Sequence, residues 1–133
     1  MSDEGAPTLP ETDVIKRTTA PQTVDGIRWE VHLNAEPPRE WLNFFKASRE
    51  ASTSAAPAVQ PSRVTFDRAS VSFRSDAEHV EEWVESLDKW IAWTDARYAI
   101  RLDEVAKARS ARLDTDARER ERIQHLNERF KNL

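Results

Sequence analysis

The chain of 133 residues has no cysteine, only two glycines and no long apolar run. Without cysteine it can form neither a disulfide framework, nor a thiolate zinc site, nor a cysteine nucleophile. Without glycine after Gly26 it has neither a phosphate-binding glycine loop nor a nucleophile elbow. No run approaches the ~20 apolar residues that cross a bilayer. We therefore expect a protein that is not an enzyme, binds no cofactor and enters no membrane.

The N-terminal stretch is acidic and polar, and therefore resembles neither a secretory signal nor a basic transit peptide. We accordingly expect a cytoplasmic protein. Metal binding has one candidate, because Asp76, His79 and Glu82 share a helix face at spacings of three and six residues. Helical carboxylate–histidine metal sites need further ligands from other helices, and the sequence supplies none. We expect a solvated acidic first turn and no metal.

Composition divides the chain into segments. Residues 1–25 are rich in Thr, Pro, Asp and Glu, so they cannot bury enough surface to offset their ordering entropy and are predicted to form a disordered acidic tail. Residues 51–61 contain small residues and proline, which predicts a flexible linker. The linker lies inside an α+β domain over residues 26–110. Residues 111–133 are predicted to form a charged helical C-terminal arm.

Three segments alternate between apolar and polar residues, as half-buried strands do. The first covers residues 27–33, and the other two cover residues 64–66 and 69–73 in opposite phases. The change of phase at Asp67-Arg68 indicates either a tight hairpin or a bulge within one strand, and the pattern leaves both open. We expect a small three-stranded sheet that is at least partly antiparallel.

Helical spacing of apolar residues predicts one short helix over residues 38–49. A longer helix follows Ser75-Asp76-Ala77-Glu78, which matches a capping box in which Ser75 and Glu78 bond each other's backbone. The pattern extends this helix to about Arg109 or Arg112, and it leaves open whether the helix continues unbroken to the C-terminus. The apolar stripe of the helix consists of Val80, Val84, Leu87, Ile91, Tyr98, Leu102 and Val105.

These elements predict an α+β fold in the order β-α-β-β-α. The short helix and the long C-terminal helix cover the sheet, and the long helix extends as an arm. Most of the aromatic residues are assigned to the core between sheet and helices. The predicted aromatic core consists of Trp29, Trp41, Phe44, Phe45, Phe66, Phe73, Trp83 and Trp90.

The long helix has apolar residues on a second side, which must also be covered. Trp93, Ala96 and Ile100 lie almost opposite the main stripe. Either this chain or a partner protein could cover them. Residues 76–96 carry a net charge of −6 and residues 97–133 a net charge of +3, counted from the sequence, so an antiparallel copy would be complementary. A second apolar patch comprises Leu126, Phe130 and Leu133.

The leading hypothesis is a non-catalytic protein–protein interaction module that self-associates or docks a partner protein through the long helix. One alternative is a nucleic-acid accessory protein, whose phosphate-binding residues would be Arg109, Arg112, Arg118, Arg120 and Arg122. The pI of about 5.4 and the interleaved acids disfavour it. The acids instead predict ion pairs within the helix at Asp114–Arg118, Asp116–Arg120 and Glu121–His125.

A second alternative is a small-ligand-binding α+β domain. Its pocket would lie between the sheet and the helices, around Trp29, His32 and Trp41.

Overall fold

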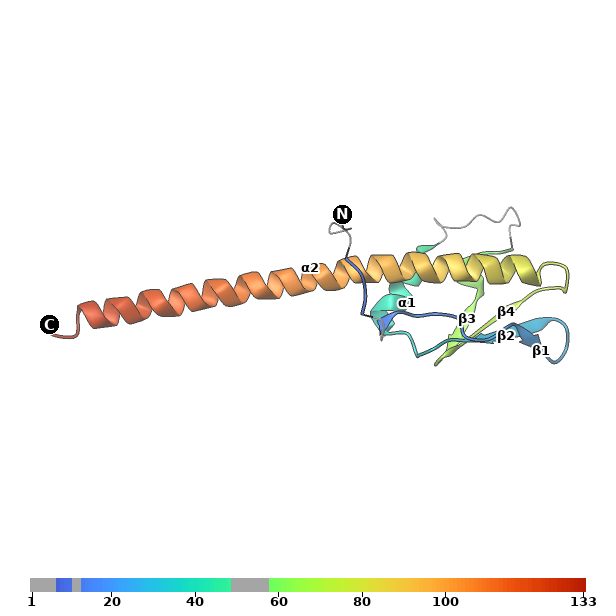
Figure 1. The fold of residues 1–133 in the computed structure, drawn as a ribbon, viewed down its shortest axis with the longest axis horizontal. Coiled ribbons are helices and arrows are strands. Elements are labelled where there is room, and N and C mark those ends of the chain that lie inside the picture. The colour runs from blue at the N-terminus through green and yellow to red at the C-terminus, as the bar shows by residue number, and fades with distance from the viewer. Residues whose placement is uncertain (1–6, 11–12, 49–57) are drawn as a thin grey trace. The chain divides into compact units, whose positions relative to one another are not determined.

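The computed structural model describes residues 7–10, 13–48 and 58–133. It confirms the α+β class. The chain divides into two compact units, residues 1–99 and 100–133. The elements in chain order are β1 (Gln22–Thr23), β2 (Arg28–His32), α1 (Arg39–Phe45), the 3₁₀ turn η3 (Pro61–Arg63), β3 (Thr65–Asp67), β4 (Ser70–Arg74) and α2 (Val80–Arg129) (Figure 1).

The sheet has four strands in the order β1-β2-β4-β3, and all neighbouring strands are antiparallel. Three strands were predicted. The additional strand, β1, has two residues and pairs Gln22 with Glu30. A strand this short has no apolar alternation, so the sequence pattern could not reveal it.

The strands β3 and β4 form a tight hairpin, which explains the change of phase near residue 67. Asp67 pairs with Ser70, so that Arg68 and Ala69 form a two-residue loop. The hairpin is therefore confirmed, and the bulge is excluded. Arg68 has a φ of 56°, in the left-handed region that glycine and asparagine adopt more readily than arginine.

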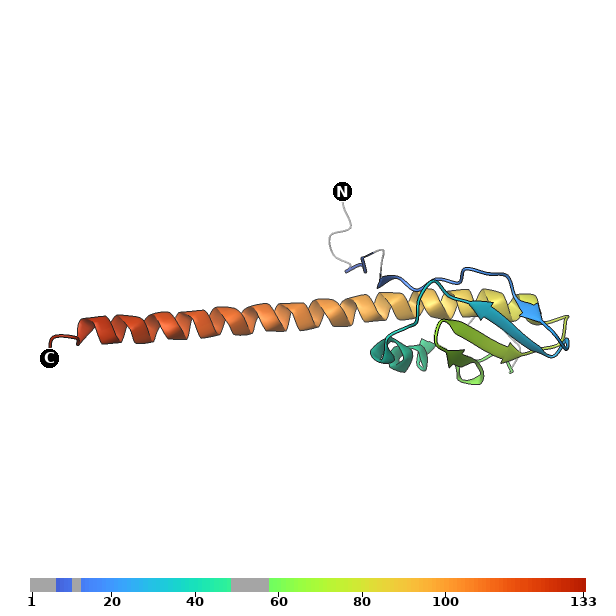
Figure 2. The same cartoon turned by 90° about the horizontal axis from the view of Figure 1, so that it is seen from below.

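Side chains alternate between the two faces of the sheet. Val31 lies opposite Val71, and both are buried on the face that α1 and residues 80–99 of α2 cover (Figures 1 and 2). Arg28, Glu30 and His32 alternate with the buried residues of β2 and are exposed on the other face. The antiparallel pairing thus places one apolar face under the helices and leaves one polar face uncovered.

Aromatic rings form a continuous chain through the core. Neighbouring rings have centroids 4.9–6.2 Å apart, in stacked or edge-to-face geometry. Such a pair contributes about 0.5–1.5 kcal/mol beyond its burial. The chain joins both helices to β3 and β4, so these contacts set the helices on the sheet. In order, its members are Phe66, Phe45, Trp90, Trp83 and Phe73, with Trp41 against Phe45 and Phe66.

The predicted aromatic core is confirmed for most of its members. Trp29 and Phe66 are half-buried and pack against the buried cluster. Phe44 is half-buried. The fully buried members are Trp41, Phe45, Phe73, Trp83 and Trp90.

The helix α1 begins after Pro38, whose φ of −64° suits the start of a helix. It ends at Phe45, earlier than residue 49, and the Ser48 hydroxyl donates to the Phe45 carbonyl at 2.6 Å. Most of the predicted linker, residues 51–57, lies outside the described residues. Its last residues are packed, because Val59 and Pro61 are both buried.

The capping box predicted at Ser75 and Glu78 is wrong. The Ser75 hydroxyl donates to the Asp76 carbonyl at 2.8 Å, and the Asp76 carboxylate accepts from the His79 backbone N–H at 3.0 Å. These bonds close a turn before α2, which begins at Val80. A short side chain on either residue can cap a turn, so the motif located the helix start to within a few residues but assigned the cap to the wrong residue.

The helix α2 is continuous over 50 residues, from Val80 to Arg129. The question of a break near Asp114 is thereby answered, because Thr115 continues the helix and its hydroxyl donates to the Ala111 carbonyl at 3.0 Å. Neither proline nor glycine occurs within these residues, so nothing in the sequence interrupts the backbone hydrogen bonds.

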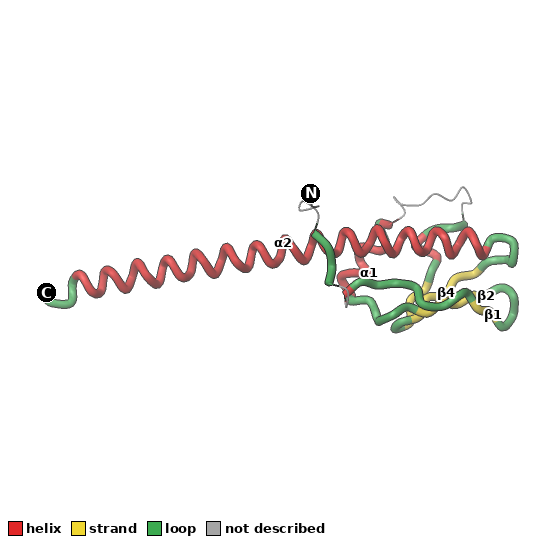
Figure 3. The backbone as a smooth tube through the Cα atoms, in the orientation of Figure 1, coloured by secondary structure: helices red, strands yellow, loops and turns green. Residues whose placement is uncertain are grey.

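The disordered tail predicted for residues 1–25 is wrong for residues 13–25, which follow the domain surface (Figure 3). Ile15 is buried in the core at 3% exposure. Lys16 donates its backbone N–H to Asn34 Oδ1 at 2.8 Å, and the Asn34 N–H donates to the Lys16 carbonyl at 3.0 Å. These hydrogen bonds and the burial of Ile15 offset the entropy lost when the segment becomes ordered. The polar composition of the segment did not reveal these contacts.

Candidate interaction surface of the long helix

The first half of α2 buries one side against the sheet and α1. Leu87, Trp90 and Ile91 are buried there. On the second side identified from the sequence, Trp93 is half-buried and Ala96 is exposed. The described residues of the first unit thus leave part of this side uncovered.

The second unit has no buried residue, and all of its residues are described. Ile100, its first residue, is 36% exposed. Leu126 is 37% exposed, Phe130 47% and Leu133 99%, so the C-terminal patch predicted from the sequence is open to solvent. Val105, Leu113 and Ile123 are exposed as well. Several large apolar side chains on one helix therefore lack cover.

Few side-chain contacts stabilise the helix of the second unit. Its ion pairs join Asp103 to Lys107, Glu119 to Arg122 and Glu128 to Lys131, at 3.0, 2.6 and 2.7 Å. Each exposed pair at this spacing contributes about 0.2–0.5 kcal/mol. The three ion pairs predicted from the sequence do not occur among the contacts of this fully described unit. The ion pairs of this unit involve other residues, such as Glu119 and Arg122.

The arginines proposed to bind nucleic acid do not share one side of the helix. At 3.6 residues per turn, Arg118 and Arg120 point about 160° apart. Arg122 is engaged by Glu119 through two hydrogen bonds, at 2.6 and 3.2 Å. A surface that follows a phosphate backbone needs its cations on one face, so this arrangement disfavours the nucleic-acid alternative.

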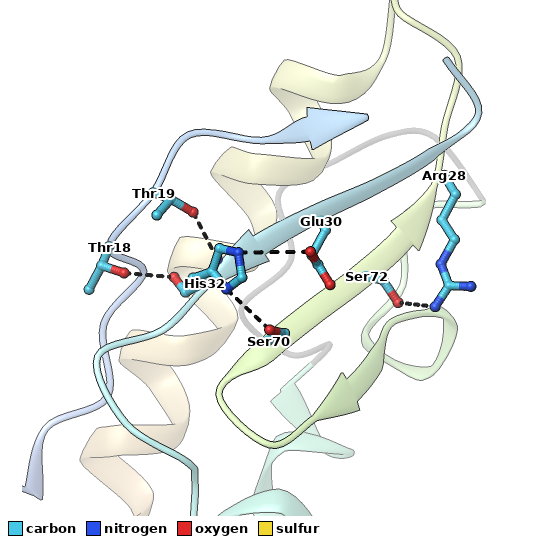
Figure 4. Close-up of polar contacts among 7 residues, drawn as sticks. All are labelled: Thr18, Thr19, Arg28, Glu30, His32, Ser70 and Ser72. Atoms are coloured by element: carbon cyan, nitrogen blue, oxygen red, sulfur yellow. Dashed lines mark hydrogen bonds and ion pairs between the residues drawn. The ribbon is translucent and has the colours of Figure 1, made fainter. Parts of the chain in front are cut away.

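The uncovered face of the sheet carries a polar cluster around His32 (Figure 4). The Ser70 hydroxyl lies 3.2 Å from His32 Nδ1, and Glu30 Oε1 lies 3.8 Å from His32 Nε2. The side chains of His32 and Glu30 are about half exposed. A Ser-His-acid triad needs a closer acid and a pocket that holds the substrate. We interpret the cluster as solvated contacts within β2 and between β2 and β4.

Two carboxylates that sequence reasoning missed hold the N-terminal segment against α2. Arg17 donates from Nε and Nη2 to the two carboxylate oxygens of Asp88, both at 2.9 Å. Asp95 Oδ1 accepts from the backbone N–H of Ile15 at 3.2 Å and from Trp41 Nε1 at 2.9 Å. The two carboxylates are seven residues apart and interrupt the apolar side of the helix, a spacing that could have indicated a docked polar segment.

Burial raises the pKa of the Asp95 carboxyl above its ordinary value, and the hydrogen bond from Trp41 opposes this shift. A hollow of about 350 Å³ lies beside this carboxylate, lined by residues of the N-terminal segment and of α2 that include Ile15, Asp88 and Ile91. Lys16 and Asp88 also line this hollow, and the positive charge of Lys16 opposes the rise in the Asp95 pKa. Asp95 functions here as a structural acceptor.

The ligand pocket predicted around Trp29, His32 and Trp41 is not formed. Trp41 is fully buried, and Trp29 is half-buried with its Nε1 donating to the Ser75 carbonyl at 2.9 Å. His32 points to the opposite face of the sheet. Strand alternation explains the separation, because residues 29 and 32 of one strand necessarily face opposite sides.

The candidate metal residues also do not form a site. His79 Nδ1 lies 2.6 Å from Asp76 Oδ1, and this hydrogen bond raises the pKa of His79 and lowers that of Asp76. No group of three or more potential ligands occurs within the described parts of the chain. Asp76 caps the turn before α2, which is the structural role that its hydrogen bonds indicate.

Among the described residues, no helix is long and apolar enough to pass through a bilayer. Comparison of this chain with protein families, curated proteins and solved structures finds no match.

Proposed function

We propose that this chain is a non-catalytic protein–protein interaction module that self-associates or docks a partner protein through α2. The observation that supports the proposal is the absence of any buried residue in the second unit, although this unit carries Val105, Ile123, Leu126 and Phe130. A few well-packed and fully desolvated side chains contribute most of the energy of protein interfaces.

Helix energetics support the same proposal. Most helical stability in proteins comes from packing of an apolar face rather than from intrinsic propensity. The first unit provides such packing for α2 through Leu87 and Trp90, whereas the second unit has no buried side chain. A protein surface that covers these side chains would stabilise the helix and remove apolar area from water.

Light scattering coupled to size-exclusion chromatography tests self-association. We expect the wild-type chain to exceed the 15.3 kDa of one chain at micromolar concentrations. Leu126→Glu should lower the measured mass, because it places a charge among the apolar side chains. Gln124→Glu is the matched control, since it introduces the same charge two residues away on another side of the helix. It should leave the mass unchanged.

A wild-type mass of one chain at every concentration would contradict self-association. Docking of a different protein would then be tested by co-purification with wild type, Leu126→Glu and Gln124→Glu chains. A partner of fixed stoichiometry that Leu126→Glu alone fails to retain would support docking through this helix. Equal retention by all three chains would contradict it.

A further inference from the structure

Side chains on one side of the second unit follow a strict seven-residue repeat. Alternating steps of three and four residues connect the eight positions, which we call the heptad seam. This spacing keeps the positions on one side of a supercoiled helix and is typical of the a and d positions of coiled coils. The heptad seam consists of Leu102, Val105, Arg109, Arg112, Asp116, Glu119, Ile123 and Leu126.

The heptad seam is complementary to the same seam of a second copy that runs in the opposite direction. Its two ends are apolar, and its centre has two cations followed by two anions. Each position has a complementary counterpart at the same distance on the other side of residue 114. The pairs related in this way are Leu102 with Leu126, Val105 with Ile123, Arg109 with Glu119, and Arg112 with Asp116.

We infer that the second unit pairs with a second copy of this chain as an antiparallel coiled coil, with its two-fold axis at residue 114. The inference rests on the proposed function and specifies its partner. Each of the four pairs occurs twice in such a dimer, and each joins an a position to a d position. In an antiparallel two-stranded coiled coil, every a position of one helix packs against a d position of the other. The seam spans about 36 Å of helix at ~1.5 Å per residue.

Charge selects this orientation over a parallel one. In a parallel dimer in register, each seam residue meets its own copy, so Arg112 faces Arg112 and Asp116 faces Asp116. In the antiparallel dimer, each of these cations faces an anion. Opposite charges in such positions favour one orientation and disfavour the other.

The central charges are available for this pairing. Within the second unit, all of which is described, no side-chain hydrogen bond or ion pair engages Arg109, Arg112 or Asp116. Glu119 is bonded to Arg122 of its own helix, and a carboxylate can accept from Arg109 of the second copy as well. Pairing with the second copy would therefore give three unpaired charges a partner.

Charge also fixes the register. Sliding one helix by seven residues in one direction places Arg109 against Arg112 and Leu102 against Glu119. Sliding it in the other direction places Asp116 against Glu119 and Arg112 against Ile123. Both shifts combine like charges with apolar–charged pairs, which are costly when desolvated. In the proposed register the exposed Leu113, which flanks the seam, meets its own copy beside the two-fold axis.

One flanking pair opposes the arrangement. Arg101 would lie near Arg129 of the second copy, at a position beside the seam and open to solvent. Exposed charge pairs contribute little to stability, because water and salt screen them. The repulsion at this rim is therefore weak, and burial of the apolar ends of the seam opposes it.

Cysteine cross-linking tests orientation and register, because none of the 133 residues is a cysteine. Chains carrying Val105→Cys are mixed with chains carrying Ile123→Cys and oxidised. We expect a covalent dimer in the mixture and none from Val105→Cys alone, since the two copies of residue 105 lie about 27 Å apart along an antiparallel pair. Ser110→Cys, outside the seam, is the control and should not cross-link.

The other possible outcomes separate the orientation of the dimer, its register and self-association itself. Cross-linking of Val105→Cys alone would show a parallel dimer and reject this inference, while self-association stands. A wild-type dimer without cross-linking in the mixture would reject the register. A wild-type chain that is monomeric at every concentration and does not cross-link would reject self-association itself.

Charge reversal tests the complementarity independently. Arg109→Glu with Arg112→Glu should abolish the dimer, and so should Asp116→Arg with Glu119→Arg. The fourfold variant reverses every central charge, retains two cations and two anions in the seam and should restore the dimer. Failure of restoration, with a helical far-UV spectrum retained, would overturn the inference.

Discussion

Trp41 Nε1 donates a hydrogen bond to Asp95 Oδ1 at 2.9 Å and thereby connects α1 with α2. The same oxygen accepts the backbone N–H of Ile15 at 3.2 Å. One carboxylate thus holds three segments that are distant in the sequence. Its removal would leave two donors without their acceptor.

We predict that Asp95→Ala destabilises the fold and that Asp95→Asn does so much less. Alanine leaves Trp41 Nε1 and the Ile15 N–H unpaired, which should lower the free energy of unfolding by about 1–3 kcal/mol. Asparagine retains an acceptor oxygen without the buried charge. Urea unfolding followed by tryptophan fluorescence measures both. Equal losses for the two variants would contradict the acceptor role.

The same carboxyl predicts a pH dependence. Burial raises its pKa in the folded state, so the folded chain binds this proton more tightly than the unfolded chain does. Its contribution to stability therefore falls as the pH rises from the unfolded pKa of about 3.9 through the raised folded value. Relative to Asp95→Asn, the wild type should lose stability across this window. A wild type that gains stability there would contradict the assignment.

The packing of the N-terminal segment predicts that a substitution at Ile15, which lies outside any helix or strand, destabilises the fold. Ile15→Ala should lower the free energy of unfolding by about 2–4 kcal/mol, because it leaves a cavity in the core. Val24→Ala is the control, since Val24 is fully exposed on the same segment. Chemical denaturation compares the two. Similar, small effects would show that residues 13–17 do not pack in solution.

The hairpin loop predicts a stabilising substitution. Arg68→Gly should raise the free energy of unfolding by up to about 1 kcal/mol, because glycine adopts the φ of 56° without the steric cost of a side chain. Arg68→Val should lower it, since a β-branched residue fits this region poorly. Thermal unfolding of both variants checks the order. A destabilised glycine variant would contradict the loop geometry.

Local patterns predicted the elements whose signals lie within a few residues. The period-two alternation of residues 27–33 located β2, and the apolar stripe from Val80 onward located α2. The aromatic residues predicted in the core are there because large apolar side chains have few other places in a domain of this size. These features depend on side-chain type and spacing, which the sequence displays directly.

The features that were missed depend on contacts between distant residues. Arg17 and Asp88 are 71 positions apart, and nothing near either residue indicates their pairing. The composition of residues 13–25 is that of a disordered segment, and only the acceptors on α2 and Asn34 change the outcome. The competing turn at Asp76 likewise replaced the predicted cap at Ser75.

The candidate surface was partly predictable. Leu126, Phe130 and Leu133, grouped as an apolar patch from the sequence, are exposed, and their role as contacts stays a prediction. The pocket around Trp29, His32 and Trp41 was wrong, since strand alternation separates residues 29 and 32. Whether a second molecule covers the exposed side chains depends on that molecule as well as on this chain, so the proposed contacts stay a prediction.

Amide hydrogen exchange of residues 102–126 in dilute and concentrated solutions tests the proposed pairing of α2 most directly. If this stretch is covered by another copy, its amides should exchange more slowly as the protein concentration rises, while those of β2 and β4 remain unchanged. Exchange in residues 102–126 that is the same at both concentrations would contradict the account.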